Sequence, residues 1–136
     1  MERFIEAHRK MYAQALSEIK GGMKTSHWMW FIFPQMRGLG YSDTAYYYGI
    51  KDKAQAIQYM QDPTLKAHML EICEALLELH TNDAESVFGH IDAVKLKSSM
   101  TLFAEASPEY DVFIRVLNKF FGEATDPKTI ELLSRE

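Results

Sequence analysis

The sequence predicts an all-α protein: a compact multihelical single domain, residues 1–136, of about seven or eight short helices. Apolar residues recur at helical spacing in at least four segments. Proline follows aspartate or serine at several points where a helix can begin. The alternating pattern of a half-buried strand is almost absent. With 47% hydrophobic residues, the chain can bury a core without a disulfide or a metal, and Cys73 is its only cysteine.

The first half contains the stretch around which the domain is expected to form. Residues 1–20 have the spacing of a helix with one buried face, and Gly21-Gly22 ends it. Residues 28–33, WMWFIF, are six apolar residues in a row that must be buried on nearly all sides. Periodicity does not separate helix from strand here, and the helical surroundings favour a helix over 27–33 at the centre of the domain. Pro34 ends this segment, and a loop follows to Gly40.

The remaining elements follow from caps and apolar spacing. Ser42 or Asp43 caps a short helix to Tyr48, and Asp52 opens another. Asp62-Pro63 starts the clearest amphipathic helix, which runs to Leu79. Further helical segments are predicted at 84–89 (one turn), from Asp92 to about Ala106 with Val94, Met100 and Phe103 inward, from Ser107-Pro108-Glu109 to Phe121, and from Asp126-Pro127 to Leu133.

Charge and composition exclude several classes of function. The net charge is −4, although residues 1–51 hold seven Lys/Arg and four Asp/Glu, or +3, and the rest is −7. An acidic chain argues against general nucleic-acid binding, whereas the positive part can favour a small anion or simply be a solvated surface. The longest apolar run falls far short of the ~20 residues of a membrane span. With one cysteine and no signal-peptide pattern, we expect a cytoplasmic protein that binds neither nucleic acid nor membrane.

Polar residues beside the aromatic run are the first candidates for chemistry. His27 titrates near neutral pH and is the candidate acid–base catalyst, or else a hydrogen-bonded histidine at the edge of the core. Trp30 can stack against a flat ring and Gln35 can bond its edge, with Tyr46 and Tyr47 from the next tyrosine cluster as further ligand contacts. Aromatic runs also simply pack. The histidines never form an i, i+4 pair, so we expect no metal and no cofactor.

The second candidate stretch is residues 92–101. On a helix, Lys95 faces Ser98 and Ser99, and Thr101 lies within the same two turns. A cation with hydroxyl groups suits a phosphate or a carboxylate. Small serines equally suit close packing against a neighbouring helix, and Asp92 can be only an N-cap.

Two stretches that mix apolar and polar residues can satisfy one another or line a common cavity. We therefore predict that His27, Gln35, Lys95 and Ser99 converge on one cleft, walled by Trp30 and a tyrosine from 46–48. In the competing interpretation, the polar groups bond to backbone at helix ends and enclose no cavity.

The motifs resemble those of a known family. The stretch SHWMWFIFPQ at 26–35 with Gly38–Ser42, and the pattern Asp92-x-x-Lys95-x-x-Ser98-Ser99-Met100-Thr101, are similar to two signatures of a conserved bacterial family of unknown function, sometimes mislabelled calpastatin. The similarity covers nearly the whole chain. It implies an all-helical fold and no established activity. A weaker likeness, to helical N-glycosidases acting on NAD or ADP-ribose, supplies no matching catalytic carboxylate.

Three functions compete at this level. One is a domain that binds a small anionic, nucleotide-like ligand between the 26–35 and 92–101 stretches. The others are an N-glycosidase for NAD/ADP-ribose-type substrates and a protein-interaction module without catalysis. The sequence identifies no reaction.

Overall fold

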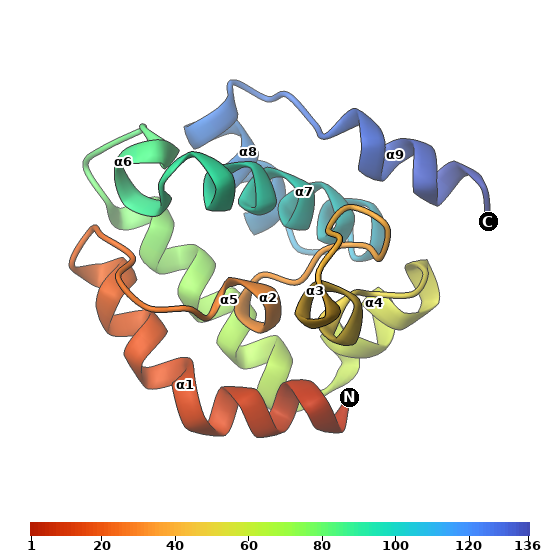
Figure 1. Ribbon diagram of the computed structural model, residues 1–136. Coiled ribbons are helices and arrows are strands. Elements are labelled where there is room, and N and C mark those ends of the chain that lie inside the picture. The colour runs from red at the N-terminus through yellow and green to blue at the C-terminus, as the bar shows by residue number, and fades with distance from the viewer.

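The computed structural model describes all residues, 1–136, as nine α-helices without a sheet (Figure 1). The helices are α1 (Glu2–Lys20), α2 (Met29–Ile32), α3 (Asp43–Tyr48), α4 (Lys53–Gln61), α5 (Pro63–Glu78), α6 (Ala84–Phe88), α7 (His90–Ala106), α8 (Val112–Phe121) and α9 (Pro127–Ser134). The all-α prediction is confirmed. Nine helices exceed the predicted total of about seven or eight, and each of the nine lies in a segment for which the sequence predicts helix or a helical turn.

Side-chain caps begin several helices where the sequence predicts them. The Asp62 carboxylate accepts hydrogen bonds from the amides of Thr64 and Leu65, and Pro63 opens α5. Asp126 caps α9 in the same way, and Ser42 and Asp52 cap α3 and α4. These short oxygens satisfy amide groups that have no partner inside the helix.

Two predicted helix starts are wrong. Helix α7 begins at His90, because Gly89 turns the chain with a φ of 79° and serves as its N-cap. Asp92 therefore lies within the first turn of α7 and is not its N-cap. Residues 107–111 form a turn, and α8 begins only at Val112. Val94, predicted to point inward, is 49% exposed.

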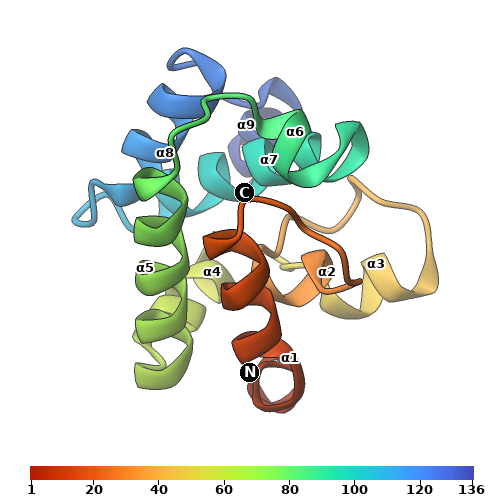
Figure 2. The same cartoon turned by 90° about the vertical axis from the view of Figure 1, so that its left-hand side faces the viewer.

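The core lies between two groups of helices. Helix α1 packs against α5 and α2, while α7 packs against α4, α6, α8 and α9. Figures 1 and 2 show α2 between α1 and α7. The predicted central segment is buried, with Trp28, Met29, Ile32 and Phe33 at most 2% exposed, but only residues 29–32 are helical. None of the nine helices combines the length and apolar character that crossing a bilayer requires.

A short backbone pairing fixes the segment that follows α2. The Ile50 amide donates to the Gln35 carbonyl and the Arg37 amide donates to the Ile50 carbonyl, both at 2.9 Å. Gly49 stands beside this pairing, and a Cβ atom there would lie 2.3 Å from Arg37 Cγ and 3.1 Å from Arg37 Cα. The pairing thereby sets where Gln35 and Arg37 lie, and it leaves no room for a side chain at position 49.

We expect Gly49→Ala to destabilise the protein by about 1–3 kcal/mol, since the added methyl group collides partly with backbone. Gly21→Ala is the matched control, because its Cβ would meet only ordinary contacts at 3.5 Å and its backbone is right-handed helical. The control should change the free energy of unfolding by less than about 1 kcal/mol. Urea unfolding of both variants checks this, and equal effects would contradict it.

Candidate functional site

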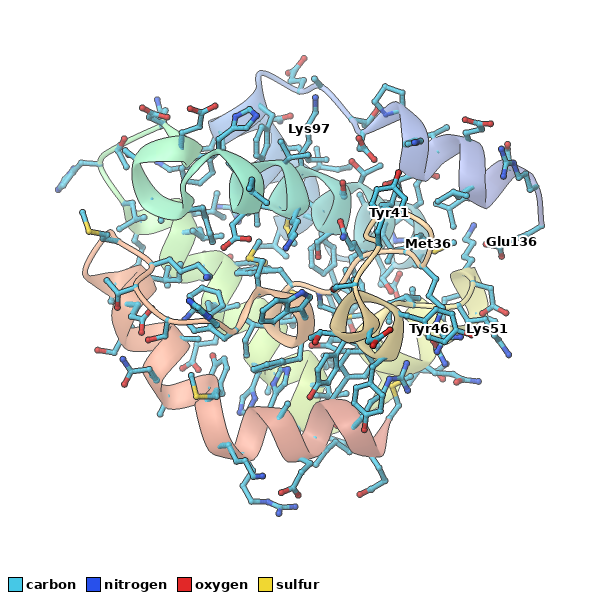
Figure 3. The ribbon with its side chains drawn as sticks, viewed as in Figure 1. Met36, Tyr41, Tyr46, Lys51, Lys97 and Glu136 are labelled. Carbon is cyan, nitrogen blue, oxygen red and sulfur yellow. The ribbon has the colours of Figure 1, made fainter.

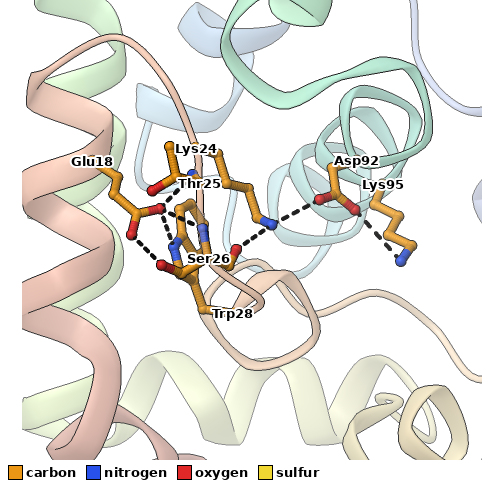
Figure 4. Close-up of polar contacts among 7 residues, drawn as sticks. All are labelled: Glu18, Lys24, Thr25, Ser26, Trp28, Asp92 and Lys95. Atoms are coloured by element: carbon orange, nitrogen blue, oxygen red, sulfur yellow. Dashed lines mark hydrogen bonds and ion pairs between the residues drawn. The ribbon is translucent and has the colours of Figure 1, made fainter.

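A buried carboxylate on α1 organises the chain before α2. Glu18 is 8% exposed, and its oxygens accept hydrogen bonds from the Thr25 and Ser26 amides at 2.7 and 2.9 Å. They also accept from the Ser26 hydroxyl at 2.6 Å, the Trp28 indole Nε1 at 2.9 Å and the Gln14 amide at 2.7 Å. We call this group of contacts the Glu18 clamp, and Figure 4 shows its contacts with Thr25, Ser26 and Trp28.

The clamp keeps Glu18 ionised. Burial alone would raise the pKa of Glu18, but the hydrogen bonds from Ser26, Gln14, Thr25 and Trp28 together lower that pKa well below its ordinary value. Hydrogen bonds to a carboxylate favour the charged form. The negative charge therefore stays in place beside Trp28 and holds the 24–28 segment on α1.

A shared aspartate connects this segment to α7. Lys24 has a side chain only 8% exposed, and its Nζ lies 2.9 Å from Asp92 Oδ2. Lys95 Nζ lies 3.5 Å from Asp92 Oδ1, and Figure 4 shows the carboxylate between the two ammonium groups. One carboxylate faces two lysines, so this trio carries one net positive charge. Each lysine also lies over a tryptophan: Lys24 is 5.0 Å from the Trp28 ring centroid and Lys95 is 5.3 Å from that of Trp30.

Lys95 faces a surface pocket of about 330 Å³, which we call the lysine pocket. Its polar lining comes from Gln35, His90, Lys95, Ser98, Asp126 and Lys128. Its apolar lining comes from Leu39, Ile91 and Val94. Ile91 and Val94 are exposed, so they offer apolar surface to whatever enters. The pocket thus combines two ammonium groups with an apolar wall.

A second, very small cavity lies where the aromatic run meets α7. Trp30, Gln35, Tyr48 and Lys95 line it together with Met29, Phe33, Ala45 and Gly49. Its volume of about 10 Å³ is about the room that one water occupies. Trp30, Gln35, Lys95 and Tyr48, which is one of the tyrosines predicted from 46–48, therefore meet here, but the space between them is too small for a ligand larger than a water.

His27 does not share the lysine pocket. It is exposed and lines a separate pocket with Arg3, Lys10 and Tyr47. The prediction of one common cleft is therefore wrong for His27, which lies against residues of α1 and not beside Gln35 and Lys95. Tyr46 lines neither pocket and stacks over the Arg37 guanidinium, 4.3 Å from its ring centroid. Tyr41 and Tyr46 both extend outward (Figure 3).

The hydroxyl groups of the second stretch divide between pocket and interior. Ser98 lines the lysine pocket and donates to the Val94 carbonyl at 3.2 Å. Ser99 and Thr101 are fully buried and line neither pocket. Thr101 donates to the Lys97 carbonyl and accepts from the Asp126 amide, which docks α9 onto α7. The Ser99 hydroxyl oxygen is buried without a hydrogen-bond partner. The burial of both residues agrees with the alternative that this stretch packs closely against neighbouring helices.

Sequence reasoning missed a buried group of histidine and tyrosine side chains. His8 Nε2 donates to the Phe31 carbonyl at 2.8 Å, and His8 Nδ1 lies 2.9 Å from His68 Nδ1. Tyr12 stacks on His68 at 3.6 Å and donates to Glu71 at 2.5 Å. The signal was present, because Phe4, His8, Tyr12 and Ala15 recur at spacings of 4, 4 and 3 on the buried face of α1.

The structure contains no cluster of three or more histidine, cysteine, aspartate or glutamate side chains that could hold a metal ion. Cys73 is fully buried beside the sulfur atoms of Met69 and Met100, and burial raises the pKa of its thiol. A thiol held protonated in the core is a poor nucleophile. The chemistry that the surface can support therefore rests on the pockets.

Fold and pockets together define a small multihelical protein whose central aromatic segment is joined by buried polar contacts to α1 and α7. The chain belongs to the family described as "Protein of unknown function (DUF1810)", which matches residues 1–133. This confirms the resemblance to a conserved family of uncharacterised proteins. The crystal structure of the conserved hypothetical protein Rv1873 from Mycobacterium tuberculosis is similar at a TM-score of 0.95 and 38% identity, over 98% of this chain and 95% of that chain. No curated protein matches the sequence.

Proposed function

We propose that the lysine pocket binds a small anionic, nucleotide-like ligand. The observation that carries this proposal is the position of Lys95, whose ammonium group shares its one carboxylate partner with Lys24 and faces a pocket of about 330 Å³. Lys128 adds a second cation from α9, and it forms no ion pair within the protein. A phosphate or carboxylate group between Lys95 and Lys128 would complete the balance of charge.

The rest of the lining suits the remainder of such a ligand. Gln35 offers both a donor and an acceptor, and the backbone pairing with Ile50 fixes the place from which its side chain extends. Ile91 and Val94 supply exposed apolar surface one turn apart on α7. A nucleotide-like molecule has an anion, hydrogen-bonding edges and a flat apolar face, and this pocket offers a counterpart for each.

Binding is favoured over cleavage of a glycosidic bond. Asp126 is the one carboxylate in the lining of the lysine pocket. Its Oδ2 already accepts from the Thr129 amide at 3.0 Å and from the Thr129 hydroxyl at 2.6 Å. A carboxylate occupied in capping α9 is poorly placed for acid–base work. A catalytic role for His27 would belong to the separate pocket that it lines.

The test is a thermal-shift screen of nucleoside phosphates, NAD, ADP-ribose and flavin precursors. A ligand present at about 100 times its Kd stabilises the folded protein by about 2.7 kcal/mol, which is a shift in Tm of several degrees. For the ligand that raises Tm most, we expect Lys95→Gln and Lys128→Gln each to weaken binding at least about tenfold, since each removes a charge-assisted hydrogen bond.

Lys97→Gln is the matched control. Lys97 lies on the same helix, half-buried and outside the lysine pocket, so its loss should leave the affinity unchanged. If no member of the panel raises Tm, or if all three lysine variants lose affinity equally, the proposal is overturned. Loss of Tm shift in the Lys95 and Lys128 variants alone supports it.

A further inference from the structure

The pocket that contains His27 is a second site, independent of the lysine pocket. Its volume is about 330 Å³, and it lies among α1, the residues before α2 and the tyrosines of α3. Arg3, Lys10 and His27 supply its basic groups, and Phe31, Tyr47 and Tyr48 its aromatic walls. It shares no lining residue with the lysine pocket. We call it the arginine pocket.

The Arg3 guanidinium lacks a counterion. Its hydrogen bonds reach only the Gly49 carbonyl at 3.5 Å and Gln55 Oε1 at 3.4 Å, both long and both to uncharged acceptors. Its Nε atom is buried without any hydrogen-bond partner. Burial and the nearby charge of Arg37 lower the pKa of Arg3, and the guanidinium lies 4.5 Å from the Phe4 ring centroid. A guanidinium that remains charged in such a place gains from an anion brought in from outside.

The remaining charges do not neutralise it. Glu6 is the one carboxylate in the lining, and it bonds Arg9 at 2.6 Å and lies 3.7 Å from Lys10. His27 forms no hydrogen bond or ion pair through its side chain. The arginine pocket therefore holds more positive than negative groups, and at least one of the positive groups is unpaired.

The aromatic walls define the other part of a ligand. Phe31 and Tyr48 lie with ring centroids 5.2 Å apart, and Tyr47 meets Tyr48 edge-on at 4.8 Å. Tyr47 is exposed, so the side of its ring that faces away from Tyr48 is accessible. Aromatic faces of this kind pack against a flat ring.

We propose that the arginine pocket binds a small aromatic anion: a flat ring that carries a phosphate or a carboxylate, with the anionic group at Arg3 and Lys10 and the ring against Tyr47 and Phe31. This site differs from the lysine pocket in its lining, its cations and its aromatic character. The proposal does not depend on the function proposed for the lysine pocket.

The experiment titrates ¹⁵N-labelled protein with phenyl phosphate and with benzoate, and follows amide and histidine signals by NMR. We expect signals of His27, Tyr47 and their neighbours to shift, with inorganic phosphate and phenol binding at least tenfold more weakly than phenyl phosphate. Whichever of phenyl phosphate and benzoate binds more tightly identifies the anion. Shifts confined to the lysine pocket, or no shifts at all, would overturn the proposal.

Single substitutions measure how much the cationic and the aromatic residues of the arginine pocket each contribute to binding. Arg3→Gln should weaken phenyl phosphate binding at least tenfold, whereas Lys20→Gln, at an exposed position on the same helix and outside the arginine pocket, should not change it. Tyr47→Ala, an exposed position that leaves the core intact, should weaken binding by about fivefold and keeps the test valid if Arg3→Gln fails to fold. Lys95→Gln should have no effect. Binding that is insensitive to both Arg3→Gln and Tyr47→Ala contradicts the proposal.

Discussion

Glu18→Ala is expected to destabilise the protein by about 3 kcal/mol or more, because it removes the acceptor of the whole Glu18 clamp. The Trp28 indole N–H is fully buried and has no other partner. A buried donor left without an acceptor costs about 1–3 kcal/mol, and the amides of Thr25 and Ser26 lose their acceptor as well. Urea unfolding, followed by tryptophan fluorescence, measures the loss.

Glu18→Gln removes the charge of Glu18 but keeps the size and shape of its side chain, so it measures what the charge contributes to stability. The amide oxygen can still accept from Trp28 and the two backbone amides, but the NH₂ group then turns a donor toward the Ser26 hydroxyl and the Gln14 amide. We therefore expect a loss smaller than that of Glu18→Ala. Glu6→Gln is the control on the same helix, because Glu6 is exposed and pairs only with surface cations. Its effect should stay within about 1 kcal/mol. Equal effects at positions 6 and 18 would show that the clamp does not hold the segment.

The free energy of unfolding should fall by about 2–3 kcal/mol between pH 7 and about pH 4.5. Burial lowers the pKa of His8 from 6.5 to about 4, and the charge of His68 acts in the same direction, against the hydrogen bond to Phe31 and the more distant Asp62. In this range the unfolded chain binds a proton at His8 and the folded protein does not. The contribution of neutral His8 to the free energy of unfolding is therefore fully present above pH 6.5 and is lost as the pH falls toward 4.

The geometry explains why His8 stays neutral. Since its Nε2–H donates to the Phe31 carbonyl, Nδ1 is the acceptor of the His68 N–H at 2.9 Å. A proton on His8 Nδ1 would face the N–H of His68, so His68 would have to move its own proton from Nδ1 to Nε2. Tyr59 and Tyr12 pack on the two rings, and neither can neutralise a cation at His8. Burial lowers the pKa of His68 too, so the pair resists protonation together.

Denaturant unfolding at several pH values checks this prediction. His8→Gln should be less stable at pH 7 but should lose most of the pH dependence above about pH 4.5, where the carboxylates are still ionised in both states. His80→Gln, at an exposed position, should keep the full dependence. A His8→Gln variant with an unchanged slope would assign the effect to other groups.

The sequence predicted the parts of this fold that depend on local chemistry. The Asp62-Pro63 and Asp126-Pro127 starts are confirmed because a cap and a fixed φ act within one turn. The starts of α7 and α8 were wrong because Gly89 and the 107–111 turn depend on how α6, α7 and α8 pack. The spacing of apolar residues could not place Val94, since its burial depends on a neighbour that only the tertiary structure supplies.

For the candidate site too, the sequence predicts features that depend on local residue types and misses those that depend on tertiary contacts. Lys95, Ser98 and Gln35 were selected as polar residues beside apolar stretches, and the structure brings these three to one pocket. The sequence does not predict the contact between Lys24 and Asp92, because the two residues lie far apart in the chain and the motif that begins at Asp92 does not indicate its partner. Lys128 was missed for the same reason. Ser99 and Thr101 have the residue types of a binding site but serve helix packing, which no pattern of residue types distinguishes.

Asp92 links the lysine pocket to the buried side chain of Lys24, because it contacts both Lys95 and Lys24. Asp92 contacts Lys24 through one oxygen and Lys95 through the other, so a movement of the carboxylate toward one lysine would alter its distance from the other. An anion that draws Lys95 away would leave Asp92 wholly to Lys24, the lysine that lies over Trp28. Ligand binding in the lysine pocket would then change the stability with which the 24–28 segment is held. By linkage, a change in that stability would alter the affinity for the ligand by the same coupling free energy.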